Sequence, residues 1–255
     1  HRIQLIDIAD SHGRPARGTG TLVAMDSGTV SGKAYIRDHI VISQVVASTV
    51  NGTANQEYVE LYNPTTWTWT INDASFDLRY VDPNNVSVTD IALTFNNTSI
   101  PANGGYYLIA NTAMVAAGGL AVAADAVYQT SLQNVIRDSK AGGIKITNDS
   151  DTVTYDKVGW SKNSDGTEPT APAQAVEGTP VTLDNGMNAG EQIVRSSVTF
   201  TSISAASGHS AWDSNVNSTD FNVGADPQDR SLTYAPKNSA TAYSPTGGTP
   251  AAGAI

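Results

Sequence analysis

Hydrophobic and polar positions alternate along much of the chain from residue 39 onward. In the stretch EYVELY (57–62), Val59 and Leu61 fall on one face of an extended strand, and Glu60 falls on the other face between two tyrosines. An Asn-Pro pair follows directly and is expected to end the strand, because proline cannot donate a hydrogen bond to a β-ladder. We therefore predict a strand with one face in a core and Glu60 solvated between the tyrosine rings. The alternative is that Glu60 binds a ligand.

Short segments of the same kind recur, and nearly all of them are bounded by Gly, Pro, Asn or Asp. They are SFDLRYVD, VTDIALTF, GGYYLIAN, GGIKITND and VTYDKVGW. Many short strands separated by turn residues are typical of an all-β sandwich or barrel. We predict an all-β sandwich, with an alanine-rich excursion at 112–129 that holds a helical turn or two. The predicted core includes Val59, Leu61, Leu78, Leu108, Ile144 and Ile146.

Two segments lie outside this pattern. Residues 1–38 contain three short strand-like runs separated by glycine turns, which indicates an N-terminal β arm rather than an independent domain. Residues 229–255 form an extended tail rich in Pro, Gly, Thr and Ala, which cannot bury enough apolar surface to fold alone. We expect this tail to be ordered only where a surface holds it. A neighbouring copy of the chain is favoured over the domain's own face.

Composition narrows the class of protein. The 255 residues include no cysteine, which excludes disulfides, thiol catalysis and cysteine-ligated metals. A net charge of −10 argues against nucleic acid as a partner. Charged residues make up only 15% of the chain, and its start at His1 is typical of a product whose signal segment has been removed. We expect a secreted or cell-surface protein, with no membrane span because no run of 18 apolar residues occurs.

Seven motifs follow one another in order between residues 39 and 228. They are VISQVV (41–46), EYVELYNPT (57–65), FDLRY (76–80), IPANGGYYLIAN (100–111), GGIKITNDSDTVTYDKVGW (142–160), GEQIVRSS (190–197) and AWDSNVNSTDFNVGADPQ (211–228). This order resembles the lamin-tail domain of secreted bacterial proteins, although Ser43 and Gln44 stand where the family carries Asn-Glu. The resemblance implies an immunoglobulin-like β-sandwich over 39–228, to which the arm and the tail are additions.

One polar cluster has the chemistry of a cation site. Asp213, Asn215, Asn217 and Asp220 place oxygen atoms at close intervals within one turn, as calcium requires. Ser218 stands where a calcium loop would have its bend glycine. The alternative is an Asx-rich turn whose side chains bond to their own backbone. No other cofactor is predicted.

Motifs of catalysis do not occur. The four histidines lack the spacing of a preset metal site, and no Gly-x-Ser-x-Gly nucleophile elbow is found. We therefore predict that the chain is not an enzyme, with a hydrolase whose carboxylates meet only in space as the minor alternative. Acceptor sequences for N-glycosylation occur at Asn51, Asn85, Asn96, Asn97, Asn148 and Asn217.

These features favour a secreted structural subunit that assembles into an extracellular filament, pilus-like fibre or surface layer. Its expected partners are other copies of the chain and, in one version, a separate helical pilin-type subunit. Four aromatic residues are predicted at interfaces: Trp67, Trp69, Tyr234 and Tyr243. The alternative is a non-catalytic glycan- or cell-surface-binding module of a larger secreted protein, in which exposed tryptophans stack on sugars.

Overall fold

The computed structural model describes residues 39–47, 57–65, 67–83, 88–116, 120, 122–128, 136, 141–162, 171–183, 192–195, 213, 215–223 and 236–241. All of them belong to one compact unit, residues 35–247. Strands dominate this unit, which confirms the predicted all-β fold. The predicted arm (1–38) lies outside the described residues, and the immunoglobulin-like topology stays a prediction.

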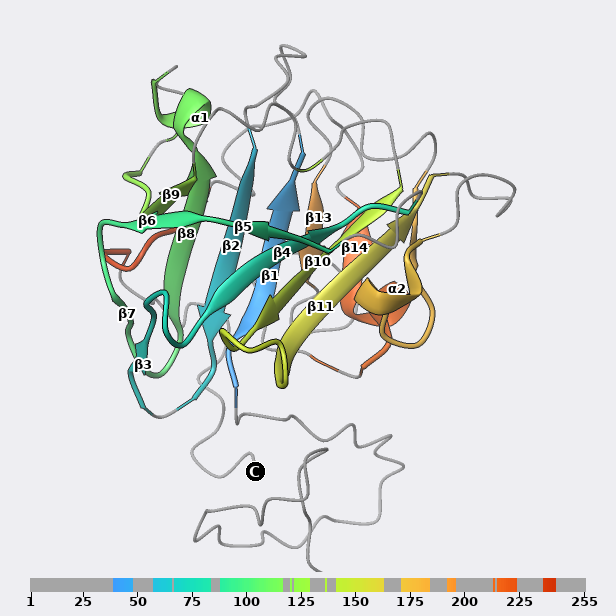
Figure 1. Ribbon diagram of the computed structural model, residues 1–255, viewed down its shortest axis with the longest axis horizontal. Helices are drawn as coiled ribbons and strands as arrows, with labels where there is room; N and C mark the ends of the chain where they lie inside the picture. The colour runs from blue at the N-terminus through green and yellow to red at the C-terminus, as the bar shows by residue number, and fades with distance from the viewer. Residues whose placement is uncertain are drawn as a thin grey trace, which may run out of the picture. The chain divides into compact units, whose positions relative to one another are not determined.

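The larger sheet has seven strands in the order β14-β13-β1-β2-β8-β9-β6 (Figure 1). Along the chain these strands are β1 (Val41–Val46), β2 (Tyr58–Asn63), β6 (Leu93–Phe95), β8 (Gly105–Asn111), β9 (Ala126–Tyr128), β13 (Ile193–Arg195) and β14 (Phe221–Val223). Neighbouring strands are antiparallel except β8 and β9, which run parallel. Asn-Pro ends β2 as the sequence predicts.

The second sheet has five strands in the order β12-β11-β10-β4-β5. They are β4 (Asp77–Val81), β5 (Val88–Ile91), β10 (Gly142–Thr147), β11 (Thr154–Ser161) and β12 (Val181–Thr182). A small sheet pairs β3 (Trp69–Thr70) with β7 (Ser99–Ile100), and the helices are α1 (Thr112–Ala116), a 3₁₀ turn (Ala173–Ala175) and α2 (Asn217–Asp220). Helix α1 falls in the predicted alanine-rich excursion. Within the described ranges, every helix is too short or too polar to cross a bilayer.

The two large sheets enclose one hydrophobic core. It contains Val59 and Leu61 from β2, and Leu78, Ile144 and Ile146 from the five-stranded sheet, as predicted. Leu108 is also fully buried, but it lies in a second cluster on the other face of β8. The strand GYYLIAN is buried at every position, and its sequence has no alternation of apolar and polar residues to mark the outer face.

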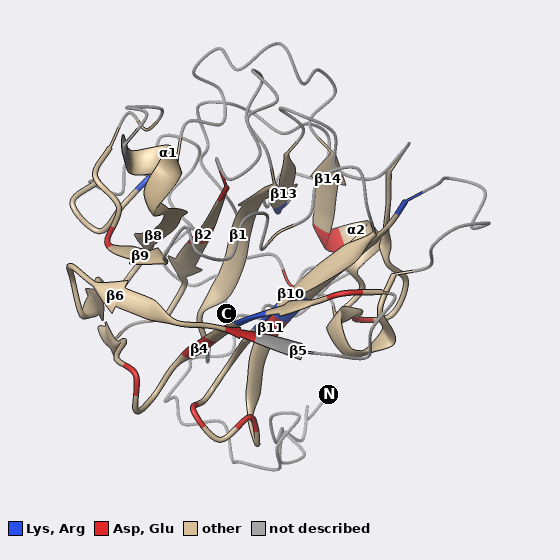
Figure 2. Cartoon of the chain, turned by 45° about the horizontal axis from the view of Figure 1, so that its top comes forward, with Lys and Arg blue, Asp and Glu red and all other residues tan. Residues whose placement is uncertain are grey.

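The outer faces of the two sheets differ in exposure. Arg79 on β4 binds Asp77, and Lys145 on β10 binds Asp151, at 2.7 and 2.8 Å, along the partly exposed outer face of the five-stranded sheet (Figure 2). The seven-stranded sheet has a covered outer face instead. Two apolar clusters lie there, one of Val46, Tyr58, Leu108, Ala110, Met114 and Ala124, the other of Val41, Tyr62 and Tyr106.

This covered face overturns the prediction for Glu60. All six residues of β2 are buried, and Glu60 has no exposed surface. A solvated carboxylate between tyrosine rings is therefore wrong. The groups that surround Glu60 come from a β-bulge in β1 at Ser43 and from the C-terminal residues 236–241.

Candidate functional site

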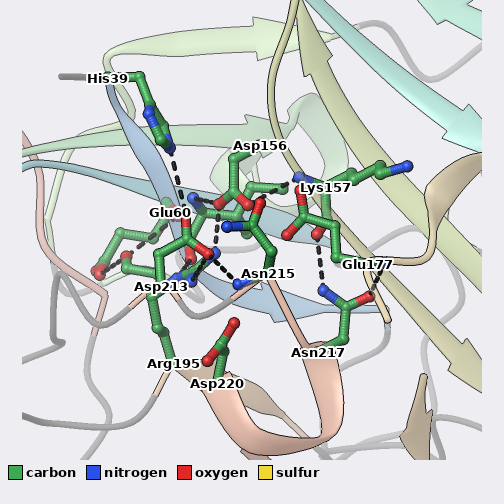
Figure 3. Close-up of polar contacts among 12 residues, drawn as sticks. His39, Glu60, Asp156, Lys157, Glu177, Arg195, Asp213, Asn215, Asn217 and Asp220 are labelled. Carbon is green, nitrogen blue, oxygen red and sulfur yellow. Dashed lines mark hydrogen bonds and ion pairs between the residues drawn. The ribbon is translucent and has the colours of Figure 1, made fainter. Parts of the chain in front are cut away.

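Five ionisable side chains meet near β11 and β13 (Figure 3). We call them the Arg195 cluster: His39, Asp156, Glu177, Arg195 and Asp213. Arg195 ends β13 of the larger sheet, and Asp156 lies in β11 of the smaller one. The cluster therefore joins the two sheets through charged groups.

Arg195 is the centre of the cluster. Its side chain has no exposed surface, and its guanidinium forms an ion pair with Asp156 and lies 3.7 Å from Asp213 Oδ1. Its Nε donates to the carbonyl of Ile42 at 2.7 Å, and the guanidinium carbon lies 4.3 Å from the centre of the Phe221 ring. A buried cation is tolerated only when it is paired and hydrogen-bonded, and Arg195 meets both conditions.

The two aspartates are fixed by further bonds. Asp156 accepts the backbone N–H groups of Ile42 and Lys157 at 2.6 and 2.8 Å. Asp213 lies 3.2 Å from the His39 ring nitrogen. Burial acts to raise the pKa of Asp213, but the His39 hydrogen bond and the charge of Arg195 lower it to about 2. Asp213 is therefore ionised under all ordinary conditions.

Glu177 is the carboxyl group of the cluster with the least support from hydrogen bonds and positive charge. Among the described residues its Oε2 is buried without a hydrogen-bond partner. Burial, and then the negative charges of Asp156 and Asp213, raise the pKa of Glu177 to about 8. Burial favours the neutral form of Glu177, and the two neighbouring carboxylates that share Arg195 act in the same direction.

Carboxylate oxygens from Asp156, Glu177 and Asp213 all lie within 4.8 Å of one another. Such a group could hold a hard cation. The guanidinium of Arg195, however, already pairs with two of the three carboxylates, so a metal ion would have to displace a fully buried side chain. The geometry favours a structural ion cluster over a metal centre.

The residues predicted to bind calcium have other partners. Asn217 Oδ1 accepts the backbone N–H groups of Gly159 and Glu177, both at 3.0 Å, and Asp220 Oδ2 accepts that of Val216 at 3.1 Å. Asp213 belongs to the Arg195 cluster, and its Oδ1 accepts the N–H of Asn215 at 3.1 Å. These contacts support the alternative of an Asx-rich structural turn. Asn217 also reaches beyond the turn, because it fixes the Glu177 loop against β11.

The predicted glycosylation sites divide into three groups. Asn51 and Asn85 lie outside the described residues. The amides of Asn96, Asn97 and Asn148 donate hydrogen bonds to Ala124, Ser239 and the 150–152 turn. Asn217 is fully buried and donates to the carbonyl of Lys157 at 3.0 Å. It cannot carry a glycan in this fold, and that prediction is corrected.

The predicted interface aromatics also differ from one another. Tyr234 and Tyr243 lie outside the described residues. Trp69 is partly buried and packs edge-on against Tyr155, with ring centroids 5.2 Å apart. Trp67 is 47% exposed and lies 6.5 Å from Trp69. Only Trp67 therefore offers a broad exposed ring among the two described tryptophans of this set.

A second polar site lies on the covered outer face of the seven-stranded sheet. We call it the docking face: Glu60, Asn97, Tyr106, Ala123 and Asp125. Its occupant is the C-terminal segment, residues 236–241. The domain's own face, which was the less favoured alternative for the tail, thus holds these six residues.

The contacts of the C-terminal segment are specific. Lys237 donates its backbone N–H to Glu60 Oε2 at 2.6 Å, and its ammonium lies 4.8 Å from the centre of the Tyr106 ring. Ser239 donates its N–H to Asp125 Oδ2 at 2.9 Å and its hydroxyl to Asp125 Oδ1. Asn238 donates to the carbonyl of Ala123 at 2.9 Å. The segment is recognised through both backbone and side chains.

Burial raises the pKa of Glu60 to about 7, although the charge and the backbone N–H of Lys237 and the Ser43 hydroxyl act to lower it. A carboxyl group with a perturbed pKa often marks a functional position. Here the perturbed group holds a polypeptide segment.

Sequence reasoning singled out Asp213 as a calcium ligand and Glu60 as an alternative ligand-binding residue, but it did not identify the cluster or the docking face to which they belong. Asp156 shares a face of β11 with the core residues Val158 and Trp160, and an inward-facing acid requires a buried partner. Glu60 stands between two tyrosines on the face of the strand opposite Val59 and Leu61. Neither pattern identifies the partner, since Arg195 and Lys237 are far away in the chain.

Comparisons with known proteins do not assign a family. The chain matches no family model, and no curated protein matches it at a significant level. The lamin-tail resemblance stays a prediction, and function rests on the geometry of the chain itself.

Proposed function

We propose that this chain is a secreted, non-catalytic structural subunit that assembles into an extracellular filament, pilus-like fibre or surface layer. The observation that carries the proposal is the docking face, where Glu60 and Asp125 hold a polypeptide segment. A site built for a peptide segment suits a protein whose work is to join chains. The predicted partners are other copies of the chain, with a helical pilin-type subunit as an additional partner.

The buried charges support a structural role. Asp156, Arg195 and Asp213 bind one another and the backbone, which leaves their polar atoms engaged inside the fold. Catalytic carboxylates must instead reach a substrate. Turnover of sugars, esters or phosphodiesters that a single acid or histidine substitution abolishes would contradict the proposal.

The proposal is tested by concentrating the purified chain and recording light scattering and electron micrographs. We expect regular polymers or sheets above a threshold concentration. Arg79→Ala serves as a control variant, because it changes a surface ion pair remote from the docking face and should assemble normally. A chain that remains monomeric at every concentration, alone and with candidate pilins, would contradict assembly.

One observation favours the alternative of a glycan- or cell-surface-binding module. Trp67 exposes 47% of its surface beside Trp69, and such rings can stack on sugars. Binding of polysaccharides by the intact chain, lost in Trp67→Ala and kept in Val115→Ala, would support this function. Val115 is the matched control because it is a similarly exposed apolar residue, at 44%.

A further inference from the structure

The docking face holds residues 236–241, the described part of the C-terminal region. Within the C-terminal segment, Thr241 donates its N–H to the carbonyl of Asn238 at 2.9 Å, and Asn238 donates its own N–H to the Thr241 hydroxyl at 3.1 Å. The segment is therefore a closed turn with its own internal bonds. Lys237, Asn238 and Ser239 provide polar and cation–π contacts to the face.

We propose that the docking face is a peptide-binding site that exchanges its occupant between copies, so that the C-terminal segment of one chain binds the docking face of the next. This inference rests on the proposed function and names the contact that would join the subunits. The ligand is a turn-forming Lys-Asn-Ser segment, and the partner is a second copy of this chain.

Chain length allows the exchange. Roughly 12 residues (224–235) connect β14 to the C-terminal segment. Within one copy, β14 and β2 are separated by three strand steps, which amounts to about 14 Å at the usual spacing of strands. A connection of this length can reach about 40 Å when extended. Its extended length exceeds the separation of β14 and β2 within one copy, so the connection does not restrict the segment to its own docking face.

The chemistry of the face favours reoccupation by the same kind of segment. The two oxygens of Asp125 accept three bonds, one from Leu108 and two from Ser239. When the segment leaves, Asp125 loses the two Ser239 donors and Glu60 loses the Lys237 N–H. The segment of a second copy carries the same donors and can restore all three bonds.

Such a contact is heterologous, because the segment and the face are different surfaces. Heterologous contacts give rings when they close and filaments when they do not. The same six contacts thus hold the segment within a monomer and join subunits in a polymer. The balance between the two states depends on the concentration of other copies relative to the effective concentration of the chain's own tethered segment.

The experiment uses the absence of cysteine from the chain. Ala123 and Ala240 are both exposed and flank the contact between Asn238 and the Ala123 carbonyl. Full-length Ala123→Cys and Ala240→Cys chains are mixed under assembly conditions and treated with a short bis-maleimide. The control mixture pairs Ala240→Cys with Ser150→Cys, which lies in the exposed turn between β10 and β11. A double variant, Ala123→Cys/Ala240→Cys, reports binding within one chain.

We expect a covalent heterodimer at a yield several-fold above that of the control mixture. A yield equal to the control, with an internal link in the double variant, would show that each chain keeps its own segment. Failure of both links would show that the face does not hold the segment. Micrographs of the same samples separate this inference from the proposed function. Polymers without heterodimers overturn the exchange alone, heterodimers without polymers overturn the structural polymer alone, and the lack of both overturns the two proposals together.

Discussion

The Arg195 cluster and the docking face both bury carboxylates in the same sandwich, but the groups that compensate them differ. In the cluster, the positive charge is a fully buried arginine on β13 that also binds the carbonyl of Ile42 and the ring of Phe221. On the docking face, the donors include two backbone amides and one hydroxyl of a six-residue segment.

Because of this difference, the Arg195 cluster is needed for the fold, whereas the docking face can release the group that it binds. Arg195 cannot leave without opening the contact between the two sheets. The C-terminal segment binds Glu60 on the outer side of β2 and Asn97, Ala123 and Asp125 beside the same sheet, and none of these contacts joins the two sheets, so the segment can leave while the core of the sandwich stays closed. The Arg195 cluster therefore stabilises the fold, and the docking face binds its segment reversibly.

The largest expected effect comes from removal of the central cation. Arg195→Leu leaves Asp156 and Asp213 buried without their positive partner, and we expect a loss of about 3–5 kcal/mol in the free energy of unfolding. Denaturant unfolding measures this loss. Arg79→Leu is the control, because its ion pair with Asp77 is partly exposed and is worth less than about 1 kcal/mol. Equal losses in the two variants would contradict a central role for Arg195.

A pH-dependent effect is expected from Glu177. Its pKa is raised to about 8 from an ordinary value of 4.5, so the folded chain keeps a proton that the unfolded chain has lost between these pH values. Stability from this group is therefore lost as pH rises from 4.5 to 8. Glu177→Gln removes the titration, and we expect the wild type to lose about 2–4 kcal/mol relative to the variant between pH 5 and pH 9. Parallel stability curves for the two proteins would exclude a protonated Glu177.

A smaller and local effect is expected on the docking face. Ser239→Ala removes the hydroxyl that donates to Asp125 and accepts from Asn97, which should weaken docking by roughly 1–2 kcal/mol. Hydrogen exchange at the Lys237 and Ser239 amides should then accelerate about 5–30-fold, while the amides of β2 keep their protection. Ser150→Ala is the matched control. Loss of protection throughout β2 would show that the segment belongs to the folding core.

The smallest effect is expected at Trp67. Because this residue is 47% exposed, Trp67→Ala should change the free energy of unfolding by less than about 0.5 kcal/mol. Thermal or denaturant unfolding tests this value. A larger loss would mean that Trp67 is a structural residue, which would remove the main support for the glycan-binding alternative.

Local patterns in the sequence determined much of the fold. Alternation in β2, β4 and β10 correctly placed Val59, Leu61, Leu78, Ile144 and Ile146 in the core, because side-chain direction in a strand has a period of two residues. Leu108 is buried as predicted, but in the cluster on the outer face of β8, since a strand without alternation does not show which face meets the main core.

Only the tertiary structure decided the environment of the charged groups. The sequence places Glu60 on the outer side of β2, but whether that side meets water depends on residues 236–241, which lie about 177 positions away. In the same way, Asp156 faces inward by its own periodicity, yet its partner Arg195 is brought there by the packing of two sheets. Periodicity is a local property of the backbone, whereas burial and charge compensation depend on which distant segments the fold brings together.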